Sequence, residues 1–321
     1  MAKYHVLIPD AVDKAALAVF APVSDITVTA PGNMPREDTL AAIGEADALI
    51  IRSSTTADAE LLQAAPKLRA IARAGVGVDN VDLAAATSRG IAVMNTPDGN
   101  TIATAEHAFG LMLALARHIP QGHTSLSGGR WERKAFMGVE LRGKTLGIIG
   151  LGRIGRAIAK RALAFEMTVI AVDPYIPADV AADMEVELVD IDTLYARSDF
   201  ITLHSLITDE TRGMINRDSI ARMKPGVRLI NAARGALINE ADLAEAIRSG
   251  HVAGAALDVF GSEPPPGDHP LIGLDGVVHT PHLAASTYDA QITVAIDAAK
   301  LIVDALLHNK YQNVVNQAVL G

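Results

Sequence analysis

With 321 residues, the chain is longer than one average domain, and a composition that is 50% hydrophobic and 20% charged is typical of soluble globular proteins. Its net charge of -9 and the lack of any Lys/Arg run argue against nucleic acid as a partner, and the apolar run 108–116 is shorter than the ~20 residues that cross a bilayer. The absence of cysteine excludes disulfides, thiolate zinc sites and a catalytic thiol, and the first residues do not resemble a signal peptide. We therefore expect a cytoplasmic protein with a small-molecule substrate.

Short β-branched runs alternate with Ala/Leu-rich, helix-like stretches through the first 95 residues. The predicted strands are Tyr4–Ile8, Ile26–Thr29, Ala48–Ile51, Leu68–Ala72 and Ile91–Met94. This alternation predicts a parallel sheet wrapped by helices.

A helix predicted over 101–118 follows the turn-like segment 95–100 and is apolar around most of its circumference. Such a helix must be buried. We expect it, together with the arm that follows as far as Gly138, to contribute to the subunit interface of a homodimer or a homotetramer.

After residue 144 the alternation of strands and helices starts again. The predicted strands are Thr145–Ile149, Thr168–Val172, Phe200–Leu203, Val227–Ile230, Ala255–Leu257 and Val277–His279. The last predicted helix, 287–308, follows the final strand and has no further place in this second unit, so we infer that it crosses back to the first. The chain is thus predicted to form two doubly wound parallel-sheet domains, one discontinuous (1–99 and 287–321) and the other (100–286) inserted into it.

Glycines 150, 152 and 155 form a G-x-G-x-x-G motif between a predicted strand and a predicted helix. A glycine-rich turn alone is equally well explained as a structural βαβ connection, but this context is typical of a dinucleotide site. In such a site Gly150 makes the tight turn, Gly152 lets the backbone approach a pyrophosphate, and Gly155 permits close helix packing. The pyrophosphate would bind the amides of Arg153 and Ile154 at the helix N-terminus.

Asp173 ends the next strand, 18 residues after Gly155, where an acidic side chain is expected to accept hydrogen bonds from a ribose. Its charge would repel a 2′-phosphate, and Pro174 and Tyr175 follow it rather than an arginine. We therefore expect NAD rather than NADP as the cofactor.

Three polar residues, Arg234, Glu263 and His282, lie just beyond predicted strand ends of the second unit, where ligands bind in open α/β sheets. Each one alone has an ordinary explanation as a solvated arginine, a loop charge or a structural histidine. Together, in order and beside a nucleotide site, they are better explained as a catalytic set.

His279 and His282 also raise the question of a metal site. Pro281 lies between them and prevents a helical ligand pair, and no carboxylate cluster nearby completes a site. We predict no metal.

Together with Gly75-Val-Gly-Val-Asp-Asn80 and the glycine motif, these three residues resemble the signature of the D-2-hydroxyacid dehydrogenases over nearly the whole chain. Trp131-Glu-Arg-Lys-Ala-Phe-Met-Gly138 and Asn313-Val-Val-Asn316 are most similar to the D-3-phosphoglycerate dehydrogenase branch of that family. The resemblance implies an NAD-binding Rossmann domain inserted into a flavodoxin-like substrate-binding domain that both chain ends form.

The chemistry of hydride transfer requires these residue types. Moving a hydride between C2 of a hydroxy acid and a nicotinamide leaves a hydroxyl proton to exchange, which His282 can carry. Glu263 would orient the imidazole and favour its protonated form. Arg234 offers a planar fork for the carboxylate and can polarise the C2 oxygen.

The resemblance also implies contacts around the two ligands. The amides of Val76 and Gly77 would hold the substrate carboxylate, and Asp258 would hold the nicotinamide carboxamide. Further residues expected beside the cofactor are Ser205, Ala232 and Ala285. Asn100 and His107 are candidates to face the substrate, although helix capping and core packing explain them equally well.

The expected activity is NAD-dependent oxidation of D-3-phosphoglycerate to 3-phosphohydroxypyruvate, a reaction of serine biosynthesis. A terminal phosphate needs a cation beyond Arg234, and Arg52 after a predicted strand end, with the hydroxyl of Ser53, is the candidate. Arg133 or Lys134 from a partner subunit's arm would be a further source. A surface cation beside an ordinary loop is the other explanation of Arg52.

Other functions stay open at this point. Within the family the alternative is a reductase of glyoxylate, hydroxypyruvate or another 2-oxo acid, whereas a formate dehydrogenase is disfavoured because that group has Gln in place of Glu263. From another class, related folds act as NAD-sensing corepressors that bind peptides. Val76 stands where close relatives have Thr, and the end of the sequence at Gly321 leads us to expect a short form without the C-terminal regulatory domain of longer members and without serine regulation through it.

Overall fold

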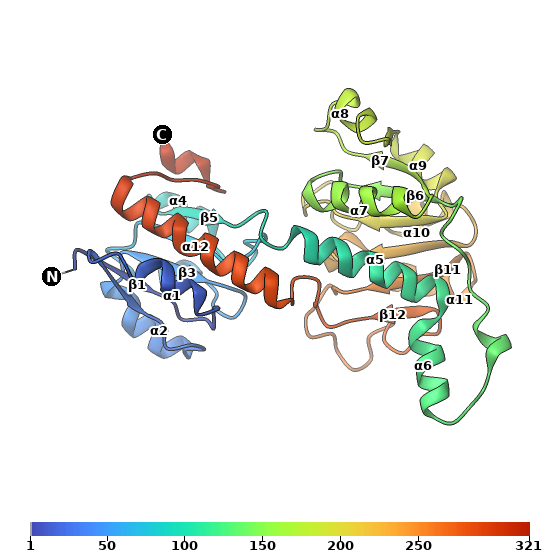
Figure 1. Cartoon of the computed structure of the whole chain (residues 1–321), viewed down its shortest axis with the longest axis horizontal. Coiled ribbons are helices and arrows are strands. Elements are labelled where there is room, and N and C mark those ends of the chain that lie inside the picture. The colour runs from blue at the N-terminus through green and yellow to red at the C-terminus, as the bar shows by residue number, and fades with distance from the viewer. Residues whose placement is uncertain (1) are drawn as a thin grey trace. The chain divides into compact units, whose positions relative to one another are not determined.

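The structure is a computed structural model that describes residues 2–321, and the chain divides into two compact units. Unit 1 contains the residues up to Asn100 together with Ser286–Gly321, and unit 2 contains Thr101–Ala285. Each unit is built on its own parallel sheet, so the fold consists of two α/β domains, as the alternation of strands and helices predicts (Figure 1).

The sheet of unit 1 has five strands in the order β2-β1-β3-β4-β5, and every neighbouring pair is parallel. Its strands are β1 (Tyr4–Leu7), β2 (Ile26–Thr29), β3 (Ala48–Ile51), β4 (Ala70–Arg73) and β5 (Ala92–Asn95). The order 2-1-3-4-5 is that of flavodoxin-like folds.

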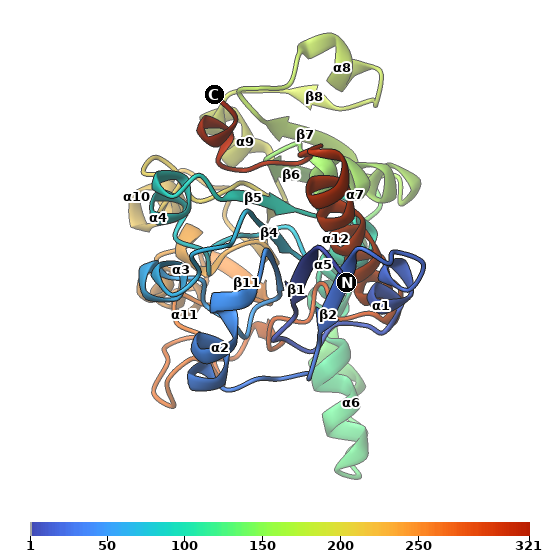
Figure 2. The same cartoon turned by 90° about the vertical axis from the view of Figure 1, so that its left-hand side faces the viewer.

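Helices cover both faces of this sheet, which is why its strands are apolar on both sides. They are α1 (Ala15–Phe20), α2 (Arg36–Ala42), α3 (Ala59–Gln63), α4 (Leu83–Ser88), α12 (Tyr288–His308) and the 3-10 turns η1 (Ile43–Glu45) and η4 (Gln317–Leu320). In β3, Ala48 and Ile50 face a core shared with α1 and α12, whereas Leu49 and Ile51 face a core shared with α3 and α4. Figure 2 shows α12 and α1 together on one side of unit 1. The C-terminal helix therefore packs on the N-terminal sheet, as inferred from the sequence.

The sheet of unit 2 has seven parallel strands in the order β12-β11-β10-β9-β6-β7-β8. Its strands are β6 (Thr145–Ile149), β7 (Thr168–Val172), β8 (Glu187–Leu188), β9 (Phe200–Leu203), β10 (Val227–Asn231), β11 (Val252–Leu257) and β12 (Val277–His279). The order reverses between β6 and β9, which is the switch point where dinucleotides bind in Rossmann folds.

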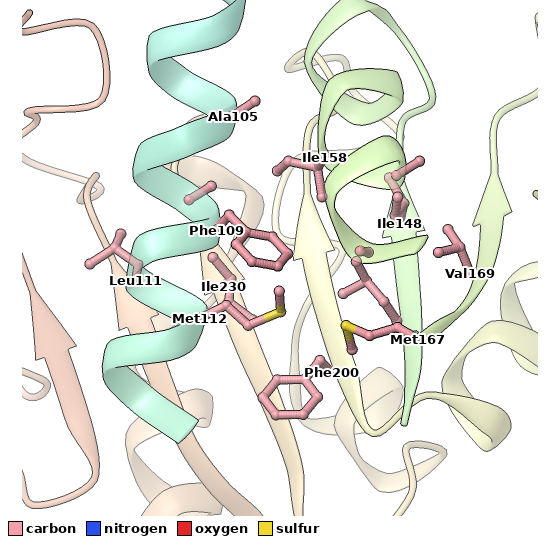
Figure 3. Close-up of a cluster of buried hydrophobic side chains, with 14 of the residues drawn as sticks. Ala105, Phe109, Leu111, Met112, Ile148, Ile158, Met167, Val169, Phe200 and Ile230 are labelled. Carbon is pink, nitrogen blue, oxygen red and sulfur yellow. The ribbon is translucent and has the colours of Figure 1, made fainter. Parts of the chain in front are cut away.

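Two helical layers enclose this second sheet. The helices and 3-10 turns are α5 (Thr101–Arg117), α6 (Ile119–Ser127), η2 (Arg133–Phe136), α7 (Arg153–Ala164), α8 (Ala178–Ala182), α9 (Ile191–Arg197), α10 (Arg217–Ala221), η3 (Gly235–Leu237) and α11 (Glu240–Arg248). Figure 3 shows Phe109 and Met112 of α5 pointing toward the strands and α7, with Ile230 near both side chains and Phe200 below them. One face of α5 thus packs in the core of unit 2, whereas residues such as Ile102 (55% exposed) leave another part of its apolar circumference uncovered.

The structure differs from the sequence prediction at the end of α5. This helix stops at Arg117, His118 is left-handed (φ 52°), and a separate helix, α6, starts at Ile119. Pro120, near the start of α6, cannot continue the α5 hydrogen-bond ladder, so the chain turns at this point. Helix α6 then projects from unit 2 (Figure 1).

Smaller differences concern strands with weak sequence signals. β8 is only two residues long and has no counterpart among the predicted strands. β11 begins at Val252, and the prediction starts it only at Ala255 because Ala253 and Gly254 lack the β-branched character on which that prediction depends. Among the described residues, no helix combines the length and apolarity needed to cross a membrane.

Candidate active site

The glycine motif connects β6 to α7, and each glycine has a distinct surrounding. Gly150 has a φ of +95°, and a Cβ there would lie 2.7 Å from the carbonyl carbon of His204. A Cβ at Gly152 would meet nothing, whereas a Cβ at Gly155 would collide with the carbonyl oxygen of Gly150. The loop therefore leaves open space beside Gly152 only, where a pyrophosphate has room to approach the backbone.

Helix α7 starts at Arg153, with Gly152 as its N-cap and no side chain capping its first turn. The first amides of a helix have no intrahelical acceptor, and the positive end of the helix dipole favours an anion there. The residues present therefore fit the phosphates of a dinucleotide.

Asp173 follows β7, is half-buried and is held beside the glycine loop by two backbone amides. Its Oδ2 accepts from the Leu151 amide at 2.8 Å and its Oδ1 accepts from the Tyr175 amide at 2.9 Å. Each carboxylate oxygen can accept a second hydrogen bond, so the geometry leaves capacity for ribose hydroxyls.

Residues after β9 line the other side of the glycine turn. Burial lowers the pKa of His204 to about 3, and Thr202 shares a 2.8 Å hydrogen bond with its Nε2. Ser205, expected at the cofactor, has a buried Oγ that finds no hydrogen-bond partner among the described residues. An orphaned hydroxyl at this place is consistent with a ligand contact.

Glu263 and His282 form a close pair. The Nδ1 of His282 lies 2.6 Å from Oε2 of Glu263, and Oε1 of Glu263 accepts from the Phe260 amide at 3.0 Å. The side chains are 52% and 37% exposed, respectively, so both groups are accessible from solvent. His282 follows β12, and Glu263 lies in the loop after β11.

Arg234 lies in the loop after β10, a neighbour of β11 in the same parallel sheet. The carboxyl ends of parallel strands share one edge, so this arginine, the Glu263–His282 pair and the glycine turn all belong to the edge where ligands bind. Buried Asn231 fixes the loop: its Nδ2 donates to the carbonyl of Arg234 at 2.8 Å and its Oδ1 accepts from the Ala233 amide at 3.0 Å. Arg234 in turn donates to the carbonyl of Ala233 at 2.7 Å.

Asp258, at the end of β11, is fully buried and accepts four hydrogen bonds. The donors to its carboxylate are the side chains of His107 and Thr280 and the backbone amides of Leu283 and Ala284. Burial alone would raise the pKa of Asp258, but these donors outweigh it and hold the pKa below its ordinary value. The contact expected between this carboxylate and a nicotinamide carboxamide stays a prediction.

The remaining residues expected at the cofactor differ in accessibility. Ala232, after β10, is buried, whereas Ala285 is half-buried at the end of unit 2. Their contacts with NAD also stay predictions.

In unit 1, Arg52 follows β3 and is half-buried, and Ser53 is exposed. The Arg52 guanidinium donates to the carbonyl of Ala11 at 3.1 Å, and its amide donates to buried Asp10 at 2.6 Å. Asn80 Nδ2 donates to the carbonyl of Arg52 at 2.7 Å. The loop that carries Arg52 is therefore rigidly held at the carboxyl end of its strand.

The segment with Val76 and Gly77 follows β4, and both residues are half-buried. Asn95 Nδ2 donates to the carbonyl of Val76 at 2.6 Å, and the hydroxyl of Thr96 accepts from the Gly75 amide at 2.8 Å. Asn100, at the end of unit 1, has a buried Oδ1 without a hydrogen-bond partner among the described residues. Their roles toward a substrate stay predictions.

Sequence reasoning did not assign a loop-holding role to any of the following residues. Asp10 and Asn80 fix the Arg52 loop, Asn231 fixes the Arg234 loop, and His107 contacts Asp258. Asp10, Asn231 and Asp258 share one signal, which is a polar side chain at or just after the end of an apolar strand. His107 lies within a helix and has no such signal.

A family model described as "D-isomer specific 2-hydroxyacid dehydrogenase, NAD binding domain" matches residues 109–284. The chain is 53% identical to a D-3-phosphoglycerate dehydrogenase of Archaeoglobus fulgidus, over 88% of this chain and 54% of that protein, so it spans about half the length of that relative. It is 47% identical to a hydroxypyruvate reductase of Thermotoga maritima, over 94% of this chain and 98% of the relative.

Among solved structures, a glyoxylate reductase from Paecilomyes thermophila has a TM-score of 0.88 and 30% identity, covering 98% of this chain and 99% of that one. The matched family model falls within unit 2, which carries the dinucleotide loop, Arg234, Glu263 and His282. The chain therefore belongs to the family of D-isomer-specific 2-hydroxyacid dehydrogenases, and its second unit is the NAD-binding domain of that family.

Proposed function

We propose that the protein oxidises D-3-phosphoglycerate to 3-phosphohydroxypyruvate with NAD and that it catalyses the reverse reduction. The observation that carries the catalytic part is the 2.6 Å contact between His282 Nδ1 and Glu263. It fixes the imidazole at the ligand-binding edge of the sheet and leaves the Nε2 position to exchange a proton with substrate.

In the oxidation, the C2–H bond breaks as a hydride leaves, the hydroxyl proton moves to His282, and a C=O bond forms at C2. NAD, when bound at the glycine loop, supplies the hydride acceptor. Glu263 stabilises the imidazolium that forms, because a carboxylate beside it favours the charged state. Arg234 binds the substrate carboxylate and stabilises negative charge on the C2 oxygen during the reverse reduction.

The substrate assignment is supported by the resemblance to D-3-phosphoglycerate dehydrogenases, including the Archaeoglobus relative. The second candidate is a hydroxypyruvate or glyoxylate reductase, which the Thermotoga relative favours because this chain covers nearly all of that protein. The two candidates differ in one chemical feature of the substrate, the terminal phosphate.

Arg52 tests this difference. A charge-assisted hydrogen bond to phosphate contributes about 1.5–3 kcal/mol, so Arg52→Ala should lower kcat/KM for 3-phosphohydroxypyruvate by roughly 10- to 100-fold. Activity with glyoxylate should barely change. Arg36→Ala is the matched control, because Arg36 is already paired with Asp58 and Glu60 on the same unit.

The assay measures NADH consumption with 3-phosphohydroxypyruvate, hydroxypyruvate and glyoxylate. Preference of the wild type for glyoxylate, or an equal loss with all three compounds in Arg52→Ala, would replace the phosphoglycerate assignment with that of a general 2-oxo acid reductase. NADH binding without turnover of any of the three would instead favour an NAD-sensing corepressor.

We further propose that the protein is a homodimer or a larger homo-oligomer. Helix α6 and the following arm project from unit 2 and carry exposed apolar side chains, among them Trp131 (76% exposed) and Met137 (79% exposed) (Figures 1 and 2). Apolar surface of this kind marks interaction sites. Light scattering at micromolar concentration should give a molar mass of at least twice that of one chain. The double variant Trp131→Glu with Met137→Glu should have a lower molar mass. A monomeric wild type would contradict the proposal.

A further inference from the structure

His282 has an unusual backbone conformation for a residue with a side chain. Its φ is 54°, in the left-handed region, which costs free energy and persists only where the surroundings hold it. Its amide donates to the carbonyl of Asp258 at 2.8 Å and to that of Thr280 at 3.1 Å. The backbone conformation from which this imidazole extends is therefore held by the carbonyls of Asp258 and Thr280.

Asp258 binds three consecutive amides starting at His282. Its main-chain carbonyl accepts from His282, its Oδ1 accepts from Leu283 at 2.7 Å, and its Oδ2 accepts from Ala284 at 2.8 Å. The carboxylate is buried, so its charge is tolerated only while enough donors surround it.

Two side chains supply the other donors, both at Oδ1. The hydroxyl of Thr280 donates at 2.6 Å, and His107 Nε2 lies 3.1 Å from the same oxygen. A charged carboxylate only accepts, so Nε2 of His107 carries the donated proton. The same Nε2 lies 3.0 Å from the Thr280 hydroxyl oxygen.

His107 is on α5, 151 residues before Asp258 in the chain, and its side chain is 23% exposed. It therefore ties the central helix of unit 2 to the loop that carries His282. Its side-chain contacts are with Asp258 and with the hydroxyl of Thr280.

We propose that His107 is a positioning residue of the dehydrogenase: by donating to Asp258 it keeps the 282–284 amides ordered and His282 oriented for proton transfer. This inference rests on the proposed function for its kinetic consequence, but its structural consequence is measurable without turnover.

The experiment uses three substitutions at one position. His107→Gln keeps an N–H donor at the place of Nε2, His107→Asn has a shorter amide that places its donor near Nδ1, and His107→Leu has no donor. His123→Leu, on exposed α6, is the matched control for replacing a helical histidine. Thr280→Val removes the second donor to the same oxygen.

The first readout is hydrogen exchange of the amides at 282–284 in the full-length protein. Exchange should be roughly tenfold faster in His107→Leu and His107→Asn, and nearly unchanged in His107→Gln and His123→Leu. Amides of β7 serve as the internal reference for global opening. If 282–284 exchange as slowly in His107→Leu as in the wild type, or β7 speeds up equally, the inference is wrong.

The second readout is kinetic. A small misplacement of an acid/base group lowers the chemical step more than binding, so kcat should decrease about 10-fold in His107→Leu while the NADH dissociation constant and KM change less than about threefold. His107→Gln should restore kcat. A Gln variant as slow as the Leu variant would overturn the inference.

Thr280→Val covers the case in which His107→Leu fails to fold. Thr280 and His107 donate to one oxygen, so the two positions are also compared in double variants. The double variant Thr280→Val with His107→Gln should remain more active than Thr280→Val with His107→Asn. Equal activities of these two double variants would overturn the inference. Absence of wild-type turnover would defeat the proposed function alone, since the exchange readout still decides the role of His107.

Discussion

At the scale of single residues, two histidines of unit 2 show how surroundings assign different roles to one side chain. His204 is half-buried with its Nδ1 out of reach of solvent, and burial lowers its pKa to about 3. His282 is half-exposed, and its Nδ1 lies 2.6 Å from Oε2 of Glu263, so its other ring nitrogen is left for a partner outside the chain. Environment rather than residue type separates a structural histidine from an acid/base candidate.

The role of His282 can be tested by truncation. Positioned acid/base groups contribute roughly 10²- to 10⁴-fold to rates, so His282→Ala should lower kcat by a factor in that range. The NADH dissociation constant should change less than about twofold, because the cofactor contacts that we propose lie at the glycine loop and at Asp173. The control is His279→Ala, an exposed histidine three residues earlier. Unchanged turnover in His282→Ala would remove it from the mechanism.

His204 makes stability depend on pH. Below about pH 6.5 His204 of the unfolded chain binds a proton, whereas His204 of the folded chain stays neutral down to about pH 3. The free energy of unfolding is therefore undiminished by His204 above about pH 6.5 and decreases as the pH falls toward 3. Lowering the pH from 7.5 to 5.0 should therefore reduce the free energy of unfolding by about 2 kcal/mol through His204 alone. His204→Gln, which keeps an amide group near Thr202, should show a smaller decrease in Tm between these pH values; equal decreases would contradict the buried neutral state.

At the scale of elements, the β6–loop–α7 connection combines a strand end, a left-handed glycine and an uncapped helix start. Open space is present at Gly152, while Gly150 and Gly155 are in close contact with main-chain atoms. In the same motif, Gly150 and Gly155 are therefore required by the packing of the fold, whereas the structure itself imposes no such requirement at Gly152.

Alanine at two of these glycines should separate the two needs. Gly155→Ala forces a Cβ against the Gly150 carbonyl and should destabilise unit 2 by about 1–3 kcal/mol or more. Gly152 has a φ of -71°, which alanine adopts without strain, so Gly152→Ala should keep the wild-type Tm. It should nevertheless weaken NADH binding by roughly 10-fold or more, because the methyl group occupies space required by the pyrophosphate. Fluorescence titration and thermal melting measure both effects; normal NADH affinity in Gly152→Ala would contradict this cofactor site.

At the scale of the whole molecule, unit 1 is assembled from both ends of the chain. Helix α12 completes one of its two cores, and the segment after it returns to β5 through Asn316. The Asn316 side chain accepts from the Val93 amide at 2.8 Å and donates to the Ile91 carbonyl at 2.9 Å and to Thr87 at 3.0 Å. These bonds close the discontinuous unit.

Asn316→Ala should therefore destabilise unit 1. Asn316 is buried, and its loss leaves a backbone amide and a carbonyl without their partner, which costs about 1–3 kcal/mol. Urea unfolding measures the change in stability, and hydrogen exchange of the β5 amides locates it in unit 1. The control is Gln317→Ala, at an exposed position. Equal stability of the two variants would show that the C-terminal segment does not hold the unit together.

Much of this architecture could be predicted because strand periodicity and glycine spacing are local properties. Six predicted strands, including Thr145–Ile149 and Phe200–Leu203, have the predicted bounds, and α12 begins at Tyr288, one residue after the predicted start of this helix at 287. Strands with weak β propensity, such as β8 and the start of β11, form because neighbouring strands supply hydrogen bonds, and that pairing is not written in the segment itself.

The sequence by itself determined the residue types of the candidate site, because a hydride transfer with proton exchange needs a histidine, a carboxylate and an arginine at strand ends, and their order along the chain could be read directly. Only the tertiary structure decided that Glu263 reaches His282, and that Asp258, His107 and Thr280 hold the loop of His282 in a left-handed conformation. The contact of His107 follows from how α5 packs on the sheet, and the other two contacts follow from the pairing of β11 with β12, which brings the loops after these strands together. No local pattern encodes either arrangement.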